Sequence, residues 1–118
     1  MKEVQFDTHR GQLKMICKER WLVRIRARLE CSEEKGRQHL SKLLGLFNAL
    51  QNGYVALSYN LKVGKPHLVS ATLVYYEEWF GKPFRWEDQN GTIPYWDREA
   101  EHWNTFEVEN ILDWRVIF

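Results

Sequence analysis

Three arginines at alternate positions, Arg24, Arg26 and Arg28, are the residues whose type and spacing most directly suggest a chemistry. A guanidinium group is planar and can donate two parallel hydrogen bonds to a phosphate or a carboxylate. On an extended strand, residues two apart point to the same side and lie roughly 6.6–6.8 Å from each other. That distance is close to the spacing of successive phosphates along an extended nucleic acid. We therefore expect the three arginines to form one binding face.

The charge pattern leaves three interpretations of this face open. Residues 1–50 hold eleven Lys and Arg against six Asp and Glu, whereas residues 51–118 hold six against ten. The acidic half could therefore pair with the arginines inside the molecule, which would relieve the repulsion between like charges on one strand. Otherwise the face binds an acidic protein surface or a nucleic acid, whose bases could stack on Tyr75 or Tyr76.

Aromatic residues form the second candidate group. Twelve of the seventeen Phe, Trp and Tyr residues lie at position 75 or later. We expect most of them to build a core, because large aromatic side chains are usually buried. Tryptophan and tyrosine also anchor protein interfaces. Together with the arginines, the residues that we expect to contact a partner are Tyr76, Trp86 and Tyr95.

The groups that could support catalysis or hold a metal show no organised spacing. The two cysteines, Cys17 and Cys31, form no CxxC pair, and we expect reduced, buried thiols. No glycine-rich phosphate loop and no HExxH sequence is found. We predict no cofactor, no metal site and no catalytic residues. The histidines are widely separated in the sequence, at His9, His39, His67 and His102.

Local patterns predict the elements that would position these residues. Apolar and charged residues alternate over residues 20–30, as in a half-buried strand that would carry the arginines. Ser32 is a suitable N-cap for a helix over residues 33–52, which has one apolar stripe. Alternation predicts further strands over residues 54–63 and 67–79.

Turn residues organise the rest of the chain. The pair Asn90-Gly91 predicts the turn of a small hairpin over residues 84–96. Asp97 is a suitable cap for a short helix, and residues 113–118 alternate as a last strand. The order resembles a ferredoxin-like βαββαβ sandwich with an inserted hairpin. A helix packed on a plain antiparallel sheet is the alternative, and both are α+β folds.

Length and composition complete the expectation. A chain of 118 residues fits one domain, 1–118, and no apolar run reaches the roughly 18 residues of a membrane span. We expect a cytoplasmic, non-catalytic protein that covers a surface of a macromolecular partner, as an inhibitor, an immunity protein or a virus-encoded regulator does. The partner would be a protein, and the chain could form a homodimer. The alternatives are a nucleic-acid-binding protein and a small enzyme, such as a nuclease, without a visible motif.

Overall fold

The structure, a computed structural model, describes the backbone of residues 2–62 and 64–117 and the side chains of residues 15–61 and 64–117. Contacts divide the chain into two compact units, residues 1–40 and residues 41–118, which we call the helical unit and the sheet unit. This division does not test the expectation that residues 1–118 form a single domain, which stays a prediction.

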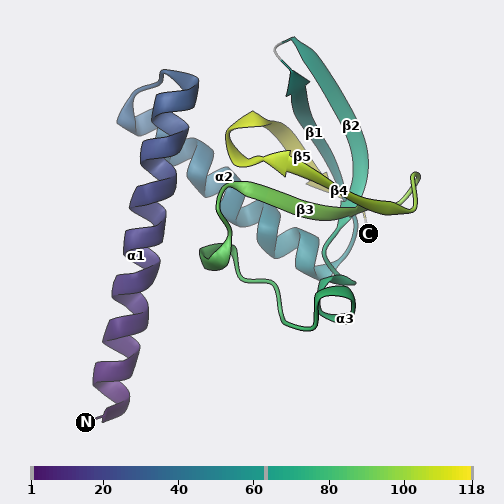
Figure 1. The fold of residues 1–118 in the computed structure, drawn as a ribbon. Coiled ribbons are helices and arrows are strands. Elements are labelled where there is room, and N and C mark those ends of the chain that lie inside the picture. Colours follow the sequence, from purple (N-terminus) through teal and green to yellow (C-terminus); the bar gives the residue numbers. More distant parts are fainter. Residues whose placement is uncertain (1, 63, 118) are drawn as a thin grey trace. The chain divides into compact units, whose positions relative to one another are not determined.

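Two helices precede the sheet along the chain, α1 (Lys2–Leu29) and α2 (Glu33–Asn52) (Figure 1). The elements that follow are β1 (Val55–Lys62), β2 (Lys65–Thr72), α3 (Tyr76–Phe80), β3 (Thr92–Asp97), β4 (His102–Glu107) and β5 (Ile111–Val116). The predicted α+β class is therefore confirmed. The ferredoxin-like order is not observed, because the segment expected to be its first strand is helical.

Helix α1 replaces the strand predicted over residues 20–30, so that prediction is wrong. Two periodicities coexist in this segment. Trp21, Val23 and Ile25 alternate as in a strand, but Cys17, Trp21 and Ile25 also recur every four residues, as on one face of a helix. Cys17, Trp21 and Ile25 are buried, whereas Val23 is 67% exposed. The helical periodicity therefore determines which side chains are buried.

Helix α2 confirms the helix predicted over residues 33–52. It begins as expected, because the Ser32 Oγ accepts the backbone N–H of Lys35 at 3.2 Å. Its first turn also comes close to α1. A Cβ atom at Gly36 would lie 2.8 Å from Leu22 Cδ1 and 2.9 Å from Arg26 Cγ. The missing side chain of Gly36 therefore allows the close approach of the two helices in the helical unit.

The sheet is antiparallel, with the strand order β4-β3-β2-β1-β5. Strand β1 lies between β2 and β5 and pairs with both. Strands β3 and β4 form a hairpin along their whole length. This hairpin pairs with β2 at Ala71 with Asp97 and at Thr72 with Trp96, and the Arg98 N–H donates to the Ser70 carbonyl at 3.0 Å. The β3–β4 hairpin is therefore attached to the rest of the sheet near the end of β2.

The hairpin predicted over residues 84–96 is wrong, because its first half is not a strand. A short 3-10 helix lies at Trp86–Asp88, and the partner of β3 is β4. Asp97 does act as a cap, but in the β3–β4 turn and not in a helix. Its Oδ1 accepts the N–H groups of Glu99 and Ala100, each at 3.1 Å.

The core of the sheet unit lies between the second half of α2 and the sheet. Its best-buried side chains are each at most 1% exposed, and they include Leu43, Leu46, Phe47, Leu50, Val55, Leu57, Ile93 and Tyr95. Strand β5 is also tied to α2 by a polar contact. The Trp114 indole N–H donates to the Lys42 carbonyl at 3.0 Å. This core supports the surfaces described next.

Candidate functional site

The three arginines do not share a face. Residues two apart on a helix are rotated by about 200°, so Arg26 lies on the side of α1 opposite to Arg24 and Arg28. The Arg26 Nε donates to the Cys31 carbonyl at 3.5 Å. Arg24 and Arg28 also have interaction partners in the structure. The shared strand face is therefore wrong, and a role of these arginines in binding stays a prediction.

Two of the three aromatic residues expected to contact a partner differ from that expectation, because they are buried. Tyr95 is completely buried, and its hydroxyl lies 2.6 Å from the Tyr59 hydroxyl. Burial, reinforced by this hydrogen bond, raises the pKa of Tyr95 above its ordinary value. Tyr76 is buried as well, and Trp86 is half-buried. Tyr76 and Tyr95 are therefore core residues, because the tertiary fold covers both side chains.

Other aromatic residues form an exposed cluster, which we call the aromatic patch. Its members are Tyr75, Trp79, Phe80, Trp96 and Trp103. Trp79 is 61% exposed and Phe80 46% exposed, both on or beside α3. Trp96 and Trp103 are half-buried and lie opposite each other on β3 and β4, with ring centroids 5.8 Å apart. Helix α3 and the β3–β4 hairpin together build this surface.

Ring contacts hold the aromatic patch in place. The Trp79 ring lies 5.6 Å from Trp96 and 6.2 Å from Trp103, and the Phe80 ring lies 5.0 Å from Trp103. Beneath them, buried Tyr76 stacks on Phe80 at 4.5 Å. Such aromatic contacts contribute about 0.5–1.5 kcal/mol each beyond the area that they bury. The exposed rings are therefore positioned before any partner arrives.

One polar atom in this region has no partner. Among the described residues, the Trp103 Nε1 is inaccessible to solvent and has no hydrogen-bond acceptor. An unsatisfied buried donor costs about 1–3 kcal/mol. The ring contacts of Trp103 with Trp79, Phe80 and Trp96 must therefore offset the cost of this unsatisfied donor.

Exposed carboxylates lie next to members of the aromatic patch along the chain. Glu77 and Glu78 are exposed on α3, and Glu99 and Glu101 are exposed in the β3–β4 turn next to Trp96 and Trp103. The sheet unit as a whole carries ten Asp and Glu against seven Lys and Arg. The exposed aromatic rings are therefore accompanied by four carboxylates, which we call the negative rim.

One cation near this surface already contacts an aromatic ring. The guanidinium carbon of Arg98 lies 5.4 Å from the centre of the Tyr54 ring. Burial and a hydrogen bond with Tyr75 raise the pKa of Tyr54, and the charge of Arg98 opposes that shift. Arg98 is thus held by a cation–π contact beside the patch.

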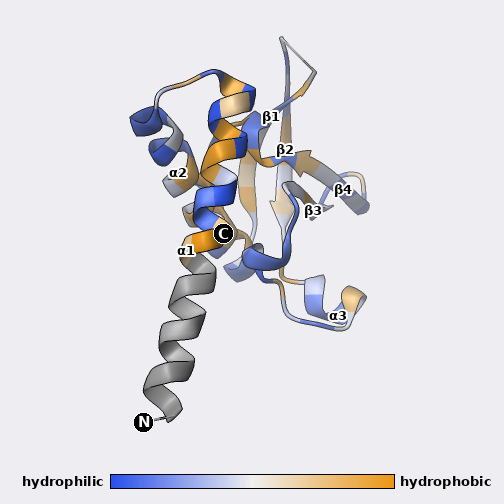
Figure 2. Ribbon diagram, turned by 60° about the vertical axis from the view of Figure 1, so that its left-hand side comes forward, coloured by the Kyte–Doolittle hydropathy of each residue, from blue (hydrophilic) through white to orange (hydrophobic). Residues whose placement is uncertain are grey.

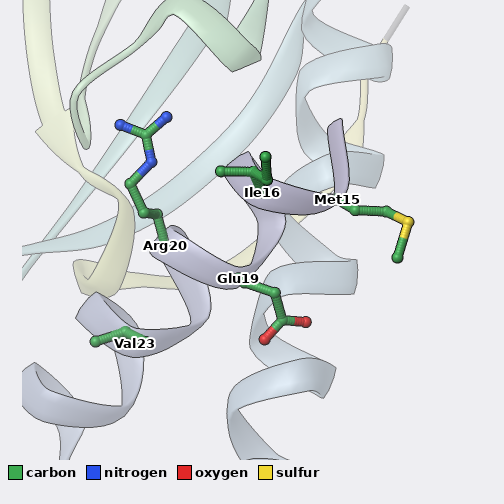
Figure 3. Close-up of a pocket in the computed structure, with 5 residues that line it drawn as sticks. All are labelled: Met15, Ile16, Glu19, Arg20 and Val23. Atoms are coloured by element: carbon green, nitrogen blue, oxygen red, sulfur yellow. The ribbon is translucent and has the colours of Figure 1, made fainter. Parts of the chain in front are cut away.

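A second exposed apolar surface lies on α1, in the helical unit. It is a shallow hollow along one side of the helix, and we call its lining residues the α1 row (Figure 3). Figure 2 shows that hydrophobic and hydrophilic residues alternate along the described part of α1. Met15 and Val23 are each 67% exposed, and Ile16 is 55% exposed. Figure 3 shows Glu19 and Arg20 pointing away from each other, on the two sides of the row. The α1 row consists of Met15, Ile16, Glu19, Arg20 and Val23.

The part of the chain that the structure describes holds no group of three or more His, Cys, Asp or Glu residues placed to bind a metal ion. None of the described helices is long and apolar enough to cross a membrane. Cys17 is buried and Cys31 is partly buried, and both are free thiols. The aromatic patch and the α1 row are therefore the surfaces that we consider for binding.

The sequence interpretation missed the main residues of the patch, Trp79, Phe80, Trp96 and Trp103. A signal for two of them was present. Tyr75, Tyr76, Trp79 and Phe80 recur at spacings of three to five, which is typical of a helix with aromatic residues on more than one side. The assignment of a long strand over residues 67–79 concealed this pattern, because β2 ends at Thr72.

Comparison with known proteins gives one finding about the sheet unit. A family model described as WYL_2, Sm-like SH3 beta-barrel fold, matches residues 43–112. The matched span begins in α2, contains β1 to β4 and the aromatic patch, and does not include α1. No curated protein and no solved structure matches the chain.

Proposed function

The chain belongs to the WYL_2 family, of Sm-like SH3 beta-barrel fold, and on this scaffold we propose that the aromatic patch binds a protein partner without catalysis. A fold of this kind can carry many functions, so the site itself must support the proposal. The exposure of Trp79 is the observation that carries it. A tryptophan that remains 61% exposed beside two further tryptophans leaves apolar area available for a partner.

The rigidity of the patch supports the same function. Tryptophan and tyrosine bury much area with few rotatable bonds, and they dominate the binding energy of protein interfaces. Here the Trp79 and Phe80 rings are already supported by Trp96 and Trp103. Binding would therefore order few additional side chains, which reduces the entropy lost on association.

The negative rim favours a basic partner. Arginine binds aromatic faces by cation–π contact and carboxylates by paired hydrogen bonds. Trp79 supplies the face, and Glu78 and Glu99 are among the nearby exposed carboxylates. The same carboxylates would repel the phosphates of a nucleic acid. We therefore propose an arginine-bearing protein segment as the ligand, with the chain acting as an inhibitor, an immunity protein or a regulator that covers this segment.

Titration of the chain with defined peptides tests this function. The probe is a peptide that alternates arginine and glycine, and the matched control is the same peptide with glutamate in place of arginine. We expect calorimetry to detect binding of the first peptide only. Trp79→Ala should weaken this binding at least about tenfold, because a tryptophan that a partner covers is a typical interface anchor.

Two control variants and a second ligand make the result decisive. Leu68→Ala removes a side chain that is 74% exposed on β2, outside the patch, and should leave the affinity unchanged. Trp86→Ala tests the tryptophan predicted from the sequence and should have a small effect. Equal losses in the Leu68 and Trp79 variants, or preferential binding of a single-stranded oligonucleotide, would contradict the proposal.

A further inference from the structure

The α1 row has a charge arrangement that fits a second copy of itself. Ile16 and Val23 are seven residues apart, so they lie on nearly the same side of α1. Glu19 and Arg20 lie between them along the chain and flank this line on opposite sides (Figure 3). The exposed surface is thus an apolar centre with one negative and one positive flank.

We propose that α1 associates with α1 of a second copy of this chain, parallel and in register, through the α1 row. In a parallel pair related by a two-fold axis along the helices, each flank of one helix faces the opposite flank of the other. Glu19 of one copy then faces Arg20 of the second copy, and the reverse contact follows by symmetry. Ile16 and Val23 each meet their own equivalents at the centre.

The antiparallel arrangement lacks this complementarity. In that arrangement Ile16 of one copy meets Val23 of the other, and flanks of the same charge face each other. Glu19 therefore approaches Glu19, and Arg20 approaches Arg20. Like charges at such positions oppose association. The charges of the row therefore select the parallel pair.

Contacts within one copy leave the flanking charges able to make these pairs. Arg37 Nη2 lies 3.3 Å from Glu19 Oε1, and the Glu19 and Arg37 side chains are 60% and 52% exposed. A carboxylate has two oxygens and can accept from two partners. The Arg20 Nη2 lies 3.7 Å from Cys17 Sγ, a weak contact that leaves its other N–H groups for a carboxylate.

The row is short, so the pair should be weak. Each copy contributes three exposed apolar side chains, those of Met15, Ile16 and Val23. Interfaces of this size fall below the roughly 1,200 Å² that stable complexes bury, and they belong to the transient class. We therefore expect a dimer that forms with rising protein concentration, independently of any ligand at the aromatic patch.

Sedimentation velocity of the full chain over a range of concentrations measures this equilibrium. Ile16→Glu should raise the dissociation constant at least about tenfold, because it places like charges at the centre of the pair. The control Lys18→Glu changes an exposed residue rotated by about 200° from Ile16 and should leave dimerisation unchanged. Helix content by circular dichroism verifies that both variants fold.

Charge exchange tests the pairing itself. Arg20→Glu should weaken the dimer about threefold to tenfold, the size expected for two exposed ion pairs. Adding Glu19→Arg to the same chain should restore it, because the flanks are again complementary. Failure of the double variant to recover, with its helix content intact, would overturn the proposed contact.

Cross-linking determines the direction of the two helices. In a chain with Cys31→Ser, the variant Val23→Cys should form a disulfide-linked dimer under mild oxidation, whereas Lys18→Cys should not. A chain that stays monomeric at all concentrations contradicts the proposal. So does a dimer that Trp79→Ala abolishes and Ile16→Glu does not, because that dimer would form through the aromatic patch.

Discussion

The two units of this chain present surfaces of opposite character. The helical unit carries ten Lys and Arg against six Asp and Glu, and among its described side chains the exposed large apolar residues lie on α1. The sheet unit carries seven against ten, and it presents the aromatic patch in addition to exposed aliphatic residues such as Leu68 and Val116. The aromatic patch draws on segments distant in the sequence, α3, β3 and β4, whereas the α1 row draws on nine consecutive positions. One chain can thus build a preorganised surface from segments distant in the sequence and a simpler one from a single helix.

The largest expected difference between the units concerns the core. Phe47→Ala removes a side chain that is 1% exposed and that contacts Phe84, with ring centroids 5.6 Å apart. We expect the free energy of unfolding of the sheet unit to fall by about 3–5 kcal/mol, from lost burial and the remaining cavity. Chemical denaturation followed by near-ultraviolet circular dichroism measures this loss. A loss below about 1 kcal/mol would mean that the core collapses into the cavity. The sheet unit would then depend less on its tertiary core than the comparison of the two units assumes.

Titration of tyrosine at alkaline pH should act on the sheet unit, because all five tyrosines lie there. The pKa of Tyr95 is raised in the folded state, so the unfolded chain loses its proton first. The stabilising contribution of neutral Tyr95 is therefore complete below its unfolded pKa of about 10 and is lost as pH rises above that value. We expect the free energy of unfolding to fall by up to about 1.4 kcal/mol per pH unit there.

The variant Tyr95→Phe is the control for this titration. It removes the ionisable group, so its unfolding free energy should depend less steeply on pH above about 10 than that of the parent chain. Denaturation curves recorded between neutral and alkaline pH compare the two chains. Identical slopes would mean that another group titrates, and Tyr54, whose pKa is also raised, would be the next candidate.

The smallest effect concerns the start of α2. Ser32→Ala removes the oxygen that accepts the Lys35 N–H, and we expect a loss of about 1 kcal/mol. Ser41→Ala, at an exposed position inside the same helix, should change the stability by less than about 0.5 kcal/mol. Thermal unfolding of both variants measures the difference. Equal effects would indicate that the Ser32 cap is not important to the helical unit.

The elements that could be predicted are those whose signals are local. Ser32 and the apolar stripe predict α2. Alternation over residues 54–63 locates β1, apart from residue 63, which lies outside the described residues. Over residues 20–30, by contrast, the same apolar residues satisfy both a strand and a helix. Local pattern could not separate the two, and the strand was the wrong choice.

The site was predicted less well for a related reason. The aromatic character of the second half was evident, but of its eleven described aromatic residues only Tyr76, Phe84, Tyr95 and Phe106 are buried, fewer than expected. Which ones remain outside was not evident. Tyr95 was expected at the surface and is buried, whereas Trp79 was expected in a strand and is exposed on α3.

The sequence by itself determined helix α2, strand β1 and the excess of aromatic residues. Caps, turns and periodicity act between neighbours in the chain, so these features can be recognised locally. Only the tertiary structure decided that α1 is a helix with an outward apolar row, and that Trp79 rests on the β3–β4 hairpin. Burial depends on which distant segments pack against a residue, and neither the type of a side chain nor its immediate neighbours specify that packing.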